Sequence, residues 1–392
     1  MRRFSANYIY TVSGKPIRNG IVGIDDEGTV VELIDPQDDI VELAGTEFHN
    51  GIIVPGFVNA HCHTELSYMK GRLTPNTGLA GFVDQIRKIR EEDEIVESLS
   101  VRNALDELHR EGIVAVADIC NSYLSFGPKL VSPIRFVNFV ELFGLLPEKA
   151  ENIIEYAREV KALAELKLQD TIAITPHAPY SLSQNLWEIV AREIELNSIA
   201  SIHFAESRQE FEFSTSRSGP LAQYYSRYGL PVDAGPKGHP VEIVKRYLPK
   251  KSTILFIHNT FLTSQQAEEL ANHFTVAVFV LCPASNLFIE NSLPDIQMLR
   301  KMGVTMAIGT DSLASAPSLS MLHQMKIIGQ RFPDIPFDEI LRWATLNGAE
   351  ALGFSEDFGS IEPGKKPGLN LITPFDFNHS KLLPASKIKR LA

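Results

Sequence analysis

The sequence predicts an α/β protein, a (β/α)8 TIM barrel with a small β-sandwich domain built from both chain termini. Eight short, almost continuously apolar segments recur between residues 52 and 311, and segments with helical spacing of apolar residues separate them. Strands of this kind are buried on both faces, as in parallel sheets, and their alternation with helices is typical of a barrel. A doubly wound open sheet is the alternative, but no Gly-rich phosphate turn follows the first such strand.

The first 50 or so residues have a different pattern. Short β-type runs with alternating apolar residues are broken at Ser13-Gly14, Asn19-Gly20 and Glu27-Gly28, which are turn signals. We therefore expect small antiparallel hairpins in this region.

The barrel elements then follow in order. The predicted parallel strands are residues 52–60, 112–120, 134–142, 171–177, 199–206, 252–259, 275–282 and 304–311. Apolar residues at spacings of three and four, with charges on the other face, predict helices over residues 77–92, 96–112, 147–166, 183–196 and 264–274.

The closing segment, residues 359–374, returns to turn-rich β character. We expect it to join the N-terminal hairpins in one small domain beside the barrel. The predicted division is therefore a β-sandwich domain of residues 1–53 and 356–392, and a barrel of residues 54–355.

Composition excludes several classes of partner. The 392 residues are 44% hydrophobic, which is ample for a large core, and 48 acidic against 37 basic residues give a formal charge of −11. That charge disfavours nucleic acid and anionic membranes as partners. The three cysteines form no CxxC, and neither a signal peptide nor a spanning apolar run is seen, so we expect a cytoplasmic protein.

Polar residues gather at the strand ends, where barrels place their active sites. A single histidine at such an end is more often structural than functional, but several together favour a metal site. Three imidazoles and a carboxylate suit Zn²⁺, with Fe²⁺ or Mn²⁺ as alternatives. His61 and His63 lie on the same side of their strand by alternation, and Cys62 between them points away as a packing residue. The strand-end residues are His61 and His63 (first strand), His177 (fourth), His203 and then Glu206 (fifth), His258 (sixth) and Asp311 (eighth).

Four motifs carry a resemblance to a known family. "PGFVNAHCHTELS", "HFAES", "HNT" and "GTDS", in that order, resemble the amidohydrolase superfamily, in the branch of cytosine deaminase, chlorotriazine hydrolases and adenosine-type deaminases. The resemblance covers nearly the whole chain, including the closing "GSIEPGKKPG". The chain departs from the family after that motif's "GK" pair, where Leu369-Asn370 follow Pro367-Gly368, and this affects only the small domain. His177, and no lysine, ends the fourth strand, which implies a mononuclear site.

The resemblance also implies roles. His61, His63, His203 and Asp311 are implied to bind the metal, Glu206 to shuttle protons, and His258 to orient the hydroxide. A divalent ion lowers the pKa of its water to about 7, and hydroxide can then attack a ring carbon bearing an amino group. A neutral Glu206 would protonate the adjacent ring nitrogen, and Asp311 would pass the water's proton to the leaving ammonia. The alternative for Glu206 is an ion-paired surface glutamate.

The substrate is predicted from weaker signals. The HxHxE opening and "TDSLAS" are similar to aminodeoxyfutalosine deaminases, whose substrate is an adenine nucleoside bearing a benzoate, so Lys70 or Arg72 could meet its carboxylate. Residues 67–78 lack apolar periodicity and suit either a lid or an ordinary solvated loop. The expected substrate contacts are Glu65, Tyr68, Arg72, Glu141, His177 and Ser312.

Other functions stay open at this stage. Within the enzyme class they are deamination of methylthioadenosine-type, pterin, guanine or cytosine substrates, triazine hydrolysis and cyclic amide ring opening. An inactive scaffold is a further alternative, although every ligand position, Glu206 and His258 are present. The combined signature of nucleic-acid deaminases, HxE with PCxxC, is absent. The expected partner is thus a small heterocycle, and the resemblance is compatible with a homodimer.

Overall fold

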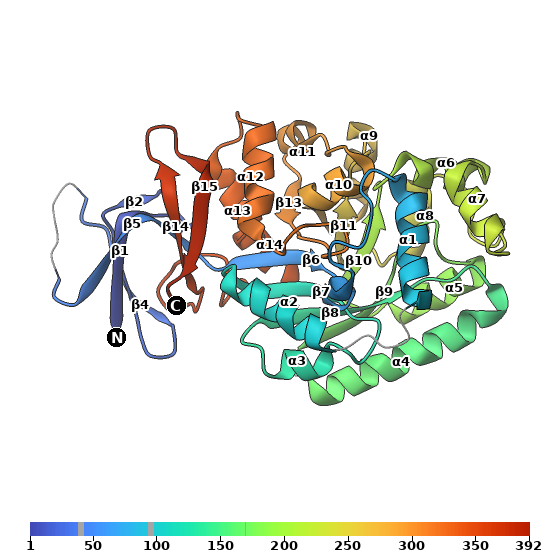
Figure 1. Cartoon of the computed structure of the whole chain (residues 1–392), viewed down its shortest axis with the longest axis horizontal. Helices are drawn as coiled ribbons and strands as arrows, with labels where there is room; N and C mark the ends of the chain where they lie inside the picture. Colours follow the sequence, from blue (N-terminus) through green and yellow to red (C-terminus); the bar gives the residue numbers. More distant parts are fainter. Residues whose placement is uncertain (38–42, 93–97, 169) are drawn as a thin grey trace.

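Eight parallel strands form the body of the protein, seen in a computed structural model that describes residues 1–37, 43–92, 98–168 and 170–392 (Figure 1). They make two four-stranded sheets, and each overlaps one of the eight predicted strands, which confirms the α/β class. The first sheet holds β6 (Phe57–Cys62), β7 (Ile113–Ile119), β8 (Arg135–Leu142) and β9 (Thr171–Pro176). The second holds β10 (Ile199–Phe204), β11 (Thr253–His258), β12 (Val276–Leu281) and β13 (Thr305–Ile308).

Backbone hydrogen bonds join the two sheets at both of their edges. Beside β9 and β10, the His203 N–H donates to the His177 carbonyl at 2.8 Å. After β13, the N–H groups of Thr310 and Asp311 both donate to the His61 carbonyl of β6 at 3.1 Å. The carboxyl ends of the first and last strands are therefore neighbours, and the polar strand ends meet in one region.

The helices cover these sheets (Figure 1). All five predicted helices are present. Residues 96 and 97, the first two of the helix predicted over residues 96–112, lie outside the described part of the chain. The additional helices are mostly too short for an apolar period to show. The helices are α1 (Gly78–Glu92), α2 (Ser98–Arg110), α3 (Phe126–Leu130), α4 (Ala150–Lys167), α5 (Gln184–Glu193), α6 (Arg208–Ser216), α7 (Gly219–Arg227), α8 (Pro240–Tyr247), α9 (Ser264–His273), α10 (Pro283–Glu290), α11 (Ile296–Met302), α12 (Met321–Arg331), α13 (Phe337–Trp343) and α14 (Leu346–Leu352), with 3-10 turns η1 (Thr64–Met69) and η2 (Pro147–Lys149).

Segments from both chain termini form a third sheet at one end of the molecule (Figure 1). The predicted hairpins are present as antiparallel pairs among β1 to β4, whereas β1 pairs with β5 in parallel. The structure has one seven-stranded sheet here, and a two-sheet sandwich stays a prediction. Its strands are β1 (Arg2–Ile9), β2 (Ile17–Arg18), β3 (Ile21–Ile24), β4 (Val30–Ile34), β5 (Thr46–Pro55), β14 (Leu369–Asp376) and β15 (Lys381–Arg390).

The predicted first barrel strand, residues 52–60, is wrong at its start. Residues 52–55 belong to β5 of the terminal sheet, and the chain enters the body only at Phe57. Gly56 lies between the two strands. Only a glycine fits at this position, because a Cβ there would lie 2.3 Å from Val114 Cγ1 and 2.5 Å from the Pro367 carbonyl oxygen. The apolar run is nearly continuous across this position, so the pattern of apolar residues does not indicate that one strand ends and another begins there.

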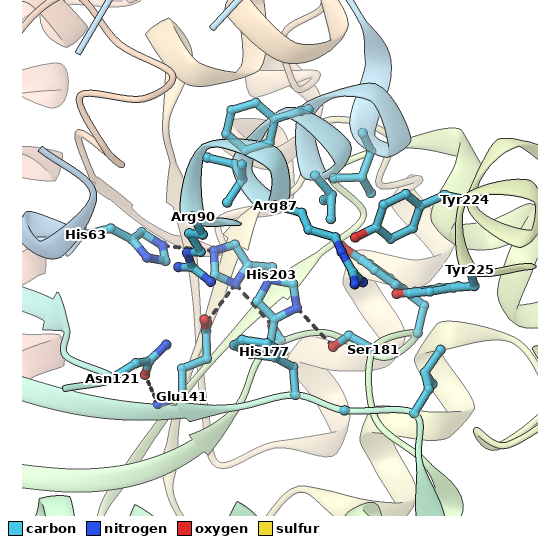
Figure 2. Close-up of a pocket in the computed structure, with 18 of the residues that line it drawn as sticks. His63, Arg87, Arg90, Asn121, Glu141, His177, Ser181, His203, Tyr224 and Tyr225 are labelled. Carbon is cyan, nitrogen blue, oxygen red and sulfur yellow. Dashed lines mark hydrogen bonds and ion pairs between the residues drawn. The ribbon is translucent and has the colours of Figure 1, made fainter. Parts of the chain in front are cut away.

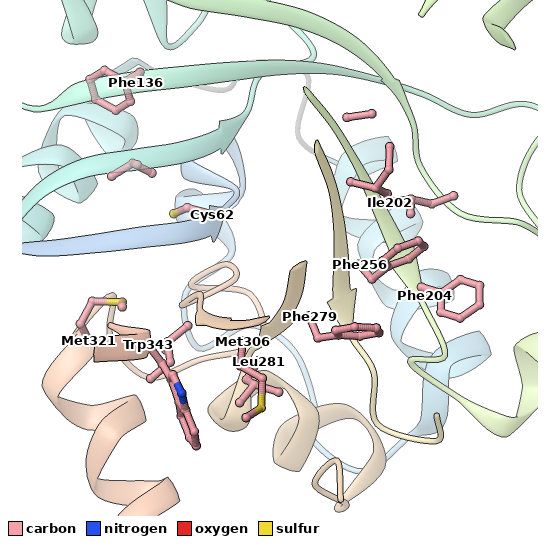
Figure 3. Packing of buried hydrophobic residues seen from close by; sticks show 14 of the residues in the cluster. Cys62, Phe136, Ile202, Phe204, Phe256, Phe279, Leu281, Met306, Met321 and Trp343 are labelled. Carbon is pink, nitrogen blue, oxygen red and sulfur yellow. The ribbon is translucent and has the colours of Figure 1, made fainter. Parts of the chain in front are cut away.

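The core holds the strands against the helices (Figure 3). Phe204, Phe256 and Phe279 are fully buried on adjacent strands, with ring centroids 5.4 Å and 5.8 Å apart along the series. All three cysteines are buried and free. Within the described residues, no helix combines the length and apolar character that crossing a membrane requires. The packed strands give the strand-end residues a rigid base.

Candidate metal and acid–base site

Three imidazoles and one carboxylate converge where β6, β10 and β13 end. The Nε2 atom of His63 lies 3.1 Å from Nε2 of His61 and 3.3 Å from Nε2 of His203. Asp311 Oδ1 lies 3.8 Å and 3.7 Å from Nε2 of His61 and His63. The structure thus brings together the four residues that the sequence singled out as one cluster.

The protonation state of this cluster favours a cation between its members. Burial lowers the pKa of both His61 and His63, so their rings are neutral at pH 7. A neutral imidazole keeps a lone pair on its unprotonated ring nitrogen, and this is the form that binds a metal ion. Imidazole nitrogens and a carboxylate oxygen are the donors that divalent transition ions bind, so this set fits one divalent metal ion.

Further contacts orient the Asp311 donor. Its backbone is in the left-handed region at φ 58°, which a non-glycine residue adopts only at a cost. Its Oδ2 accepts the hydroxyl hydrogens of Ser285 and, at 2.9 Å, Ser315. These bonds leave Oδ1 directed at the imidazoles.

His203 is oriented by groups outside the cluster. Its Nδ1 lies 3.1 Å from both Glu141 Oε1 and the His177 carbonyl oxygen, so Nε2 faces the cluster (Figure 2). Burial alone would lower the pKa of His203, but the Glu141 carboxylate outweighs it and raises the pKa to about 9. The neighbouring His177 and His203 in turn overcome burial and hold the pKa of Glu141 well below its usual range. Because a metal needs the deprotonated Nε2, ion binding and proton release are coupled at this residue.

Glu206 and His258 form an acid–base pair beside the cluster. The His258 Nδ1 lies 2.8 Å from Asn286 Oδ1, and its Nε2 lies 3.5 Å from Glu206 Oε1. Because an amide oxygen only accepts, the Nδ1 atom carries a hydrogen, and in the neutral imidazole Nε2 is then the acceptor. Both side chains are buried. The two side chains therefore lie next to one another at the bottom of the cavity described below.

A cavity of ≈ 500 Å³ opens above these groups (Figure 2). His63, His203, Glu206, His258 and Asp311 form its polar floor. Its walls are largely apolar, with Leu79, Phe82, Val83 and Ile86 from α1 and Tyr224 and Tyr225 from α7. A site of this volume, with a few convergent polar groups, suits a small organic ligand.

The predicted substrate contacts fall into two groups. Glu141, His177 and Ser312 line the cavity. Glu65, Tyr68 and Arg72 are not among the described residues that line it, so the geometry gives their predicted role no support.

Glu65 and Lys70 are engaged elsewhere. The Glu65 carboxylate accepts the N–H groups of Asn121 at 3.0 Å and Ser122 at 3.3 Å, and burial raises its pKa to about 7. Lys70 pairs with Glu107 at 3.2 Å. Glu65 therefore ties η1 to the loop after β7, and a carboxylate contact by Lys70 would require breaking its ion pair.

Sequence reasoning missed the cations at the cavity. Arg87 and Arg90 of α1 line it together with Lys149. The Arg87 guanidinium lies 3.8 Å from the Tyr228 ring centroid and donates to Glu91 at 2.8 Å. Arg90 is exposed, and among the described residues it has no hydrogen bond or ion pair. The spacing of three between the arginines puts them on one helix face, but the sequence does not reveal that this face lies over the cavity.

Fold and site together define a hydrolase of the α/β class with a metal-binding active centre. Residues 52–390 match the Amidohydrolase family, and the chain belongs to this family. It is accordingly an enzyme that hydrolyses C–N bonds outside peptides, and the predicted resemblance is confirmed.

Curated relatives carry deaminase names. The chain is 26% identical over 344 residues to adenosine deaminase of Helicobacter pylori, a match covering 84% of this chain and 80% of that protein. It is 25% identical over 360 residues to aminodeoxyfutalosine deaminase of Nitratiruptor sp., covering 87% and 85%.

Solved structures show the same fold. Aminofutalosine deaminase of Helicobacter pylori, in complex with methylthio-coformycin, matches with a TM-score of 0.80 and 22% identity over 100% of both chains. An adenosine deaminase of Xanthomonas campestris with bound zinc matches with a TM-score of 0.72 and 22% identity over 94% of this chain and 84% of that chain.

Proposed function

We propose that this protein is a mononuclear, zinc-dependent hydrolytic deaminase of an adenine-type nucleoside, of the aminodeoxyfutalosine kind. The observation that carries the proposal is the convergence of His61, His63, His203 and Asp311 on a cavity floor that also holds Glu206. The names of the curated relatives and the zinc bound by a structural neighbour support the same reading.

The four converging residues would hold the ion. A divalent ion in this site would supply the Lewis acidity that makes water nucleophilic at neutral pH. Asp311 would bind the ion through Oδ1, because Ser285 and Ser315 occupy Oδ2, and we assign the same carboxylate as the acceptor of that water's proton. His258, held by Asn286, presents an acceptor nitrogen that can orient the water.

Glu206 would supply the proton that the substrate needs. Attack on a ring carbon that bears an amino group places negative charge on the adjacent ring nitrogen, and a neutral carboxyl group can protonate it. Glu206 is buried and lines the cavity, so its carboxyl group can reach a substrate bound there. Asp311 would then pass the proton taken from the water to the amino group, which leaves as ammonia.

The cavity walls fit a substrate longer than a bare nucleobase. The apolar face of α1 and the tyrosines of α7 suit an apolar or aromatic substituent, and Arg87, Arg90 and Lys149 suit a carboxylate at its end. These cations replace Lys70 and Arg72 as the residues we assign to the carboxylate.

The same proposal includes the finer architecture. The hydrogen bonds at both sheet edges support a closed eight-stranded barrel of residues 54–355, with residues 1–53 and 356–392 as a separate small domain.

The proposal also covers location and assembly. The three free cysteines suit the cytoplasm. A homodimer completes the expectation, and light scattering in solution would test it.

Replacing Glu206 tests the proposed chemistry. The Glu206→Gln variant keeps the size and polarity of the side chain but cannot deliver a carboxylic proton. We expect ammonia release from the adenine nucleoside to fall by about 10²- to 10⁴-fold, while the metal content per chain stays that of the wild type. A variant that deaminates at the wild-type rate would contradict the assignment.

A further inference from the structure

The turn that carries Glu206 is held in an unusual conformation. Strand β10 ends at Phe204, and Ala205 then adopts φ 49°, in the left-handed region. Ala205 is not a glycine, so this conformation persists only where surrounding contacts impose it. Glu206 follows, and Ser207 is the N-cap of α6.

Glu210, in the first turn of α6, supplies those contacts. Its side chain is fully buried, and its Oε2 accepts the N–H of Glu206 at 3.2 Å. The backbone N–H of Ala205 also contributes electrostatically to this carboxyl group. The arrangement resembles a capping box, in which the fourth residue reaches back to the N-cap backbone. Here the carboxyl group reaches one residue further, to the backbone of the acid–base residue.

The second oxygen of Glu210 is left without a protein partner. Among the described residues no hydrogen bond reaches Oε1, which is buried. The hydroxyl group of Tyr180, whose ring lines the cavity, is likewise buried without a partner and interacts electrostatically with Glu210. Within the described residues no ion pair includes Glu210, and the nearby Glu206 carboxyl group opposes a second negative charge there.

The surroundings of Glu210 thus favour its neutral form. The charged and titratable groups that influence it are Glu206 and His203 on β10 and its turn, and Tyr180 after β9. Burial raises the pKa of Glu210 to about 8, so the group keeps its proton at pH 7. A neutral carboxyl group still accepts the backbone N–H of Glu206, and it adds no second negative charge beside that residue.

We propose that Glu210 is a positioning residue of the acid–base site, which fixes the Ala205–Glu206 turn by accepting the Glu206 backbone N–H and so aims Glu206 at His258 and the substrate. The inference rests on the proposed role of Glu206. It makes a specific demand, since a neutral acceptor of the same length should replace Glu210 whereas an apolar side chain should not.

The test compares Glu210→Met with Glu210→Gln in the metal-loaded full-length enzyme. We expect Glu210→Met to lower kcat by about 10- to 100-fold, because small displacements of a reacting group cost that much. KM and metal content should stay within twofold of the wild type. Glu210→Gln should restore most of kcat. Glu212→Met, on the exposed face of the same helix, is the matched control for loss of a carboxyl group.

Three outcomes would overturn the inference. The first is a folded Glu210→Met enzyme with the wild-type kcat. The second is a Glu210→Gln enzyme whose kcat is as low as that of Glu210→Met. The third is a Glu212→Met enzyme whose kcat falls as much as that of Glu210→Met. Should Glu210→Met fail to fold, Glu210→Asp takes its place, since it keeps the carboxyl group but shortens its reach. It should then show the same loss of kcat, and a full kcat would overturn the inference.

The wild type and Glu206→Gln separate this inference from the function on which it rests. If the wild type and Glu206→Gln both release no ammonia, the proposed function fails and the role of Glu210 fails with it. If the wild type is active and Glu206→Gln is not, while Glu210→Met is unimpaired, the function stands and only the role of Glu210 is lost.

Discussion

At the residue scale, neighbouring groups set the chemistry of the site. Asp311 directs one oxygen at the imidazoles because two serine hydroxyls occupy the other, and His258 presents an acceptor nitrogen because Asn286 fixes its opposite side. Such contacts decide which atom of each side chain faces the cavity. The same reasoning gives two predictions about single residues.

The first concerns recognition of a carboxylate by Arg90. Replacing Arg90 with Met should raise KM for a carboxylate-bearing adenine nucleoside by about 10-fold or more, the loss expected for one charge-assisted hydrogen bond. KM for plain adenosine should change little. Steady-state ammonia release with both nucleosides measures the difference.

Lys88→Met, an exposed position on the same helix outside the cavity, is the matched control for Arg90. Arg72→Met tests the sequence-based assignment in the same assay. Equal effects of Arg90→Met on both nucleosides would rule out the assigned contact.

The second residue prediction concerns pH. Because the pKa of Glu210 is raised from 4.5 to about 8, its protonated form stabilises the fold fully below pH 4.5, and this contribution is lost as pH rises through about 8. Glu210→Gln does not titrate. As the pH rises from 5 to 9, the free energy of unfolding of Glu210→Gln should therefore increase relative to that of the wild type, by at most about 5 kcal/mol.

Denaturant unfolding of both metal-loaded proteins across this pH range measures the Glu210 effect. Glu65, whose pKa is raised to about 7, is present in both proteins and cancels in the comparison. A difference in stability that stays constant with pH would show that Glu210 does not titrate in this range.

At the element scale, a buried ion pair supports the turn that carries His63. Lys129 of α3 lies 2.6 Å from Asp118 of β7, and both side chains are fully buried. Asp118 accepts the N–H of Thr64 at 2.9 Å and its hydroxyl hydrogen at 2.7 Å. The pair thus anchors the start of η1 directly after His63.

Lys129→Met should destabilise the protein by about 3–5 kcal/mol, because it leaves the Asp118 charge buried and unpaired. The double change Lys129→Met/Asp118→Leu should recover part of that stability. It should still retain metal more weakly than the wild type, because the anchor of Thr64 is gone. Urea unfolding and competition with a chelator measure the two effects.

Arg158→Met, which removes an exposed partner of Glu193, is the control for Lys129 and should cost about 1 kcal/mol or less. If the single and double variants at Lys129 and Asp118 lose the same stability, the buried charge is not the cause.

The elements also show how far the sequence reaches. Strand-end residues such as His61 and Asp311 are predictable because the apolar runs locate the strands and a parallel arrangement brings their ends together. Arg90 and Tyr224 are not, since their place over the cavity depends on how α1 and α7 pack. The break at Gly56 and the parallel pairing of β1 with β5 depend on contacts distant in sequence.

At the scale of the whole molecule, the architecture separates support from chemistry. The terminal sheet gathers both ends of the chain at one side of the molecule (Figure 1). The proposed ligands all lie at or just after the carboxyl ends of the parallel strands β6, β10 and β13. Membership of the Amidohydrolase family follows from residues 52–390, which include all of those ligands.

Ammonia release by the metal-loaded protein tests the central claim most directly. The substrates are adenine nucleosides with and without a carboxylate, guanine, cytosine, pterins and aminotriazines. We predict the fastest release from the carboxylate-bearing adenine nucleoside, loss of activity on chelation and recovery with zinc. Failure to release ammonia from any adenine nucleoside, with one metal ion bound per chain, would contradict the account.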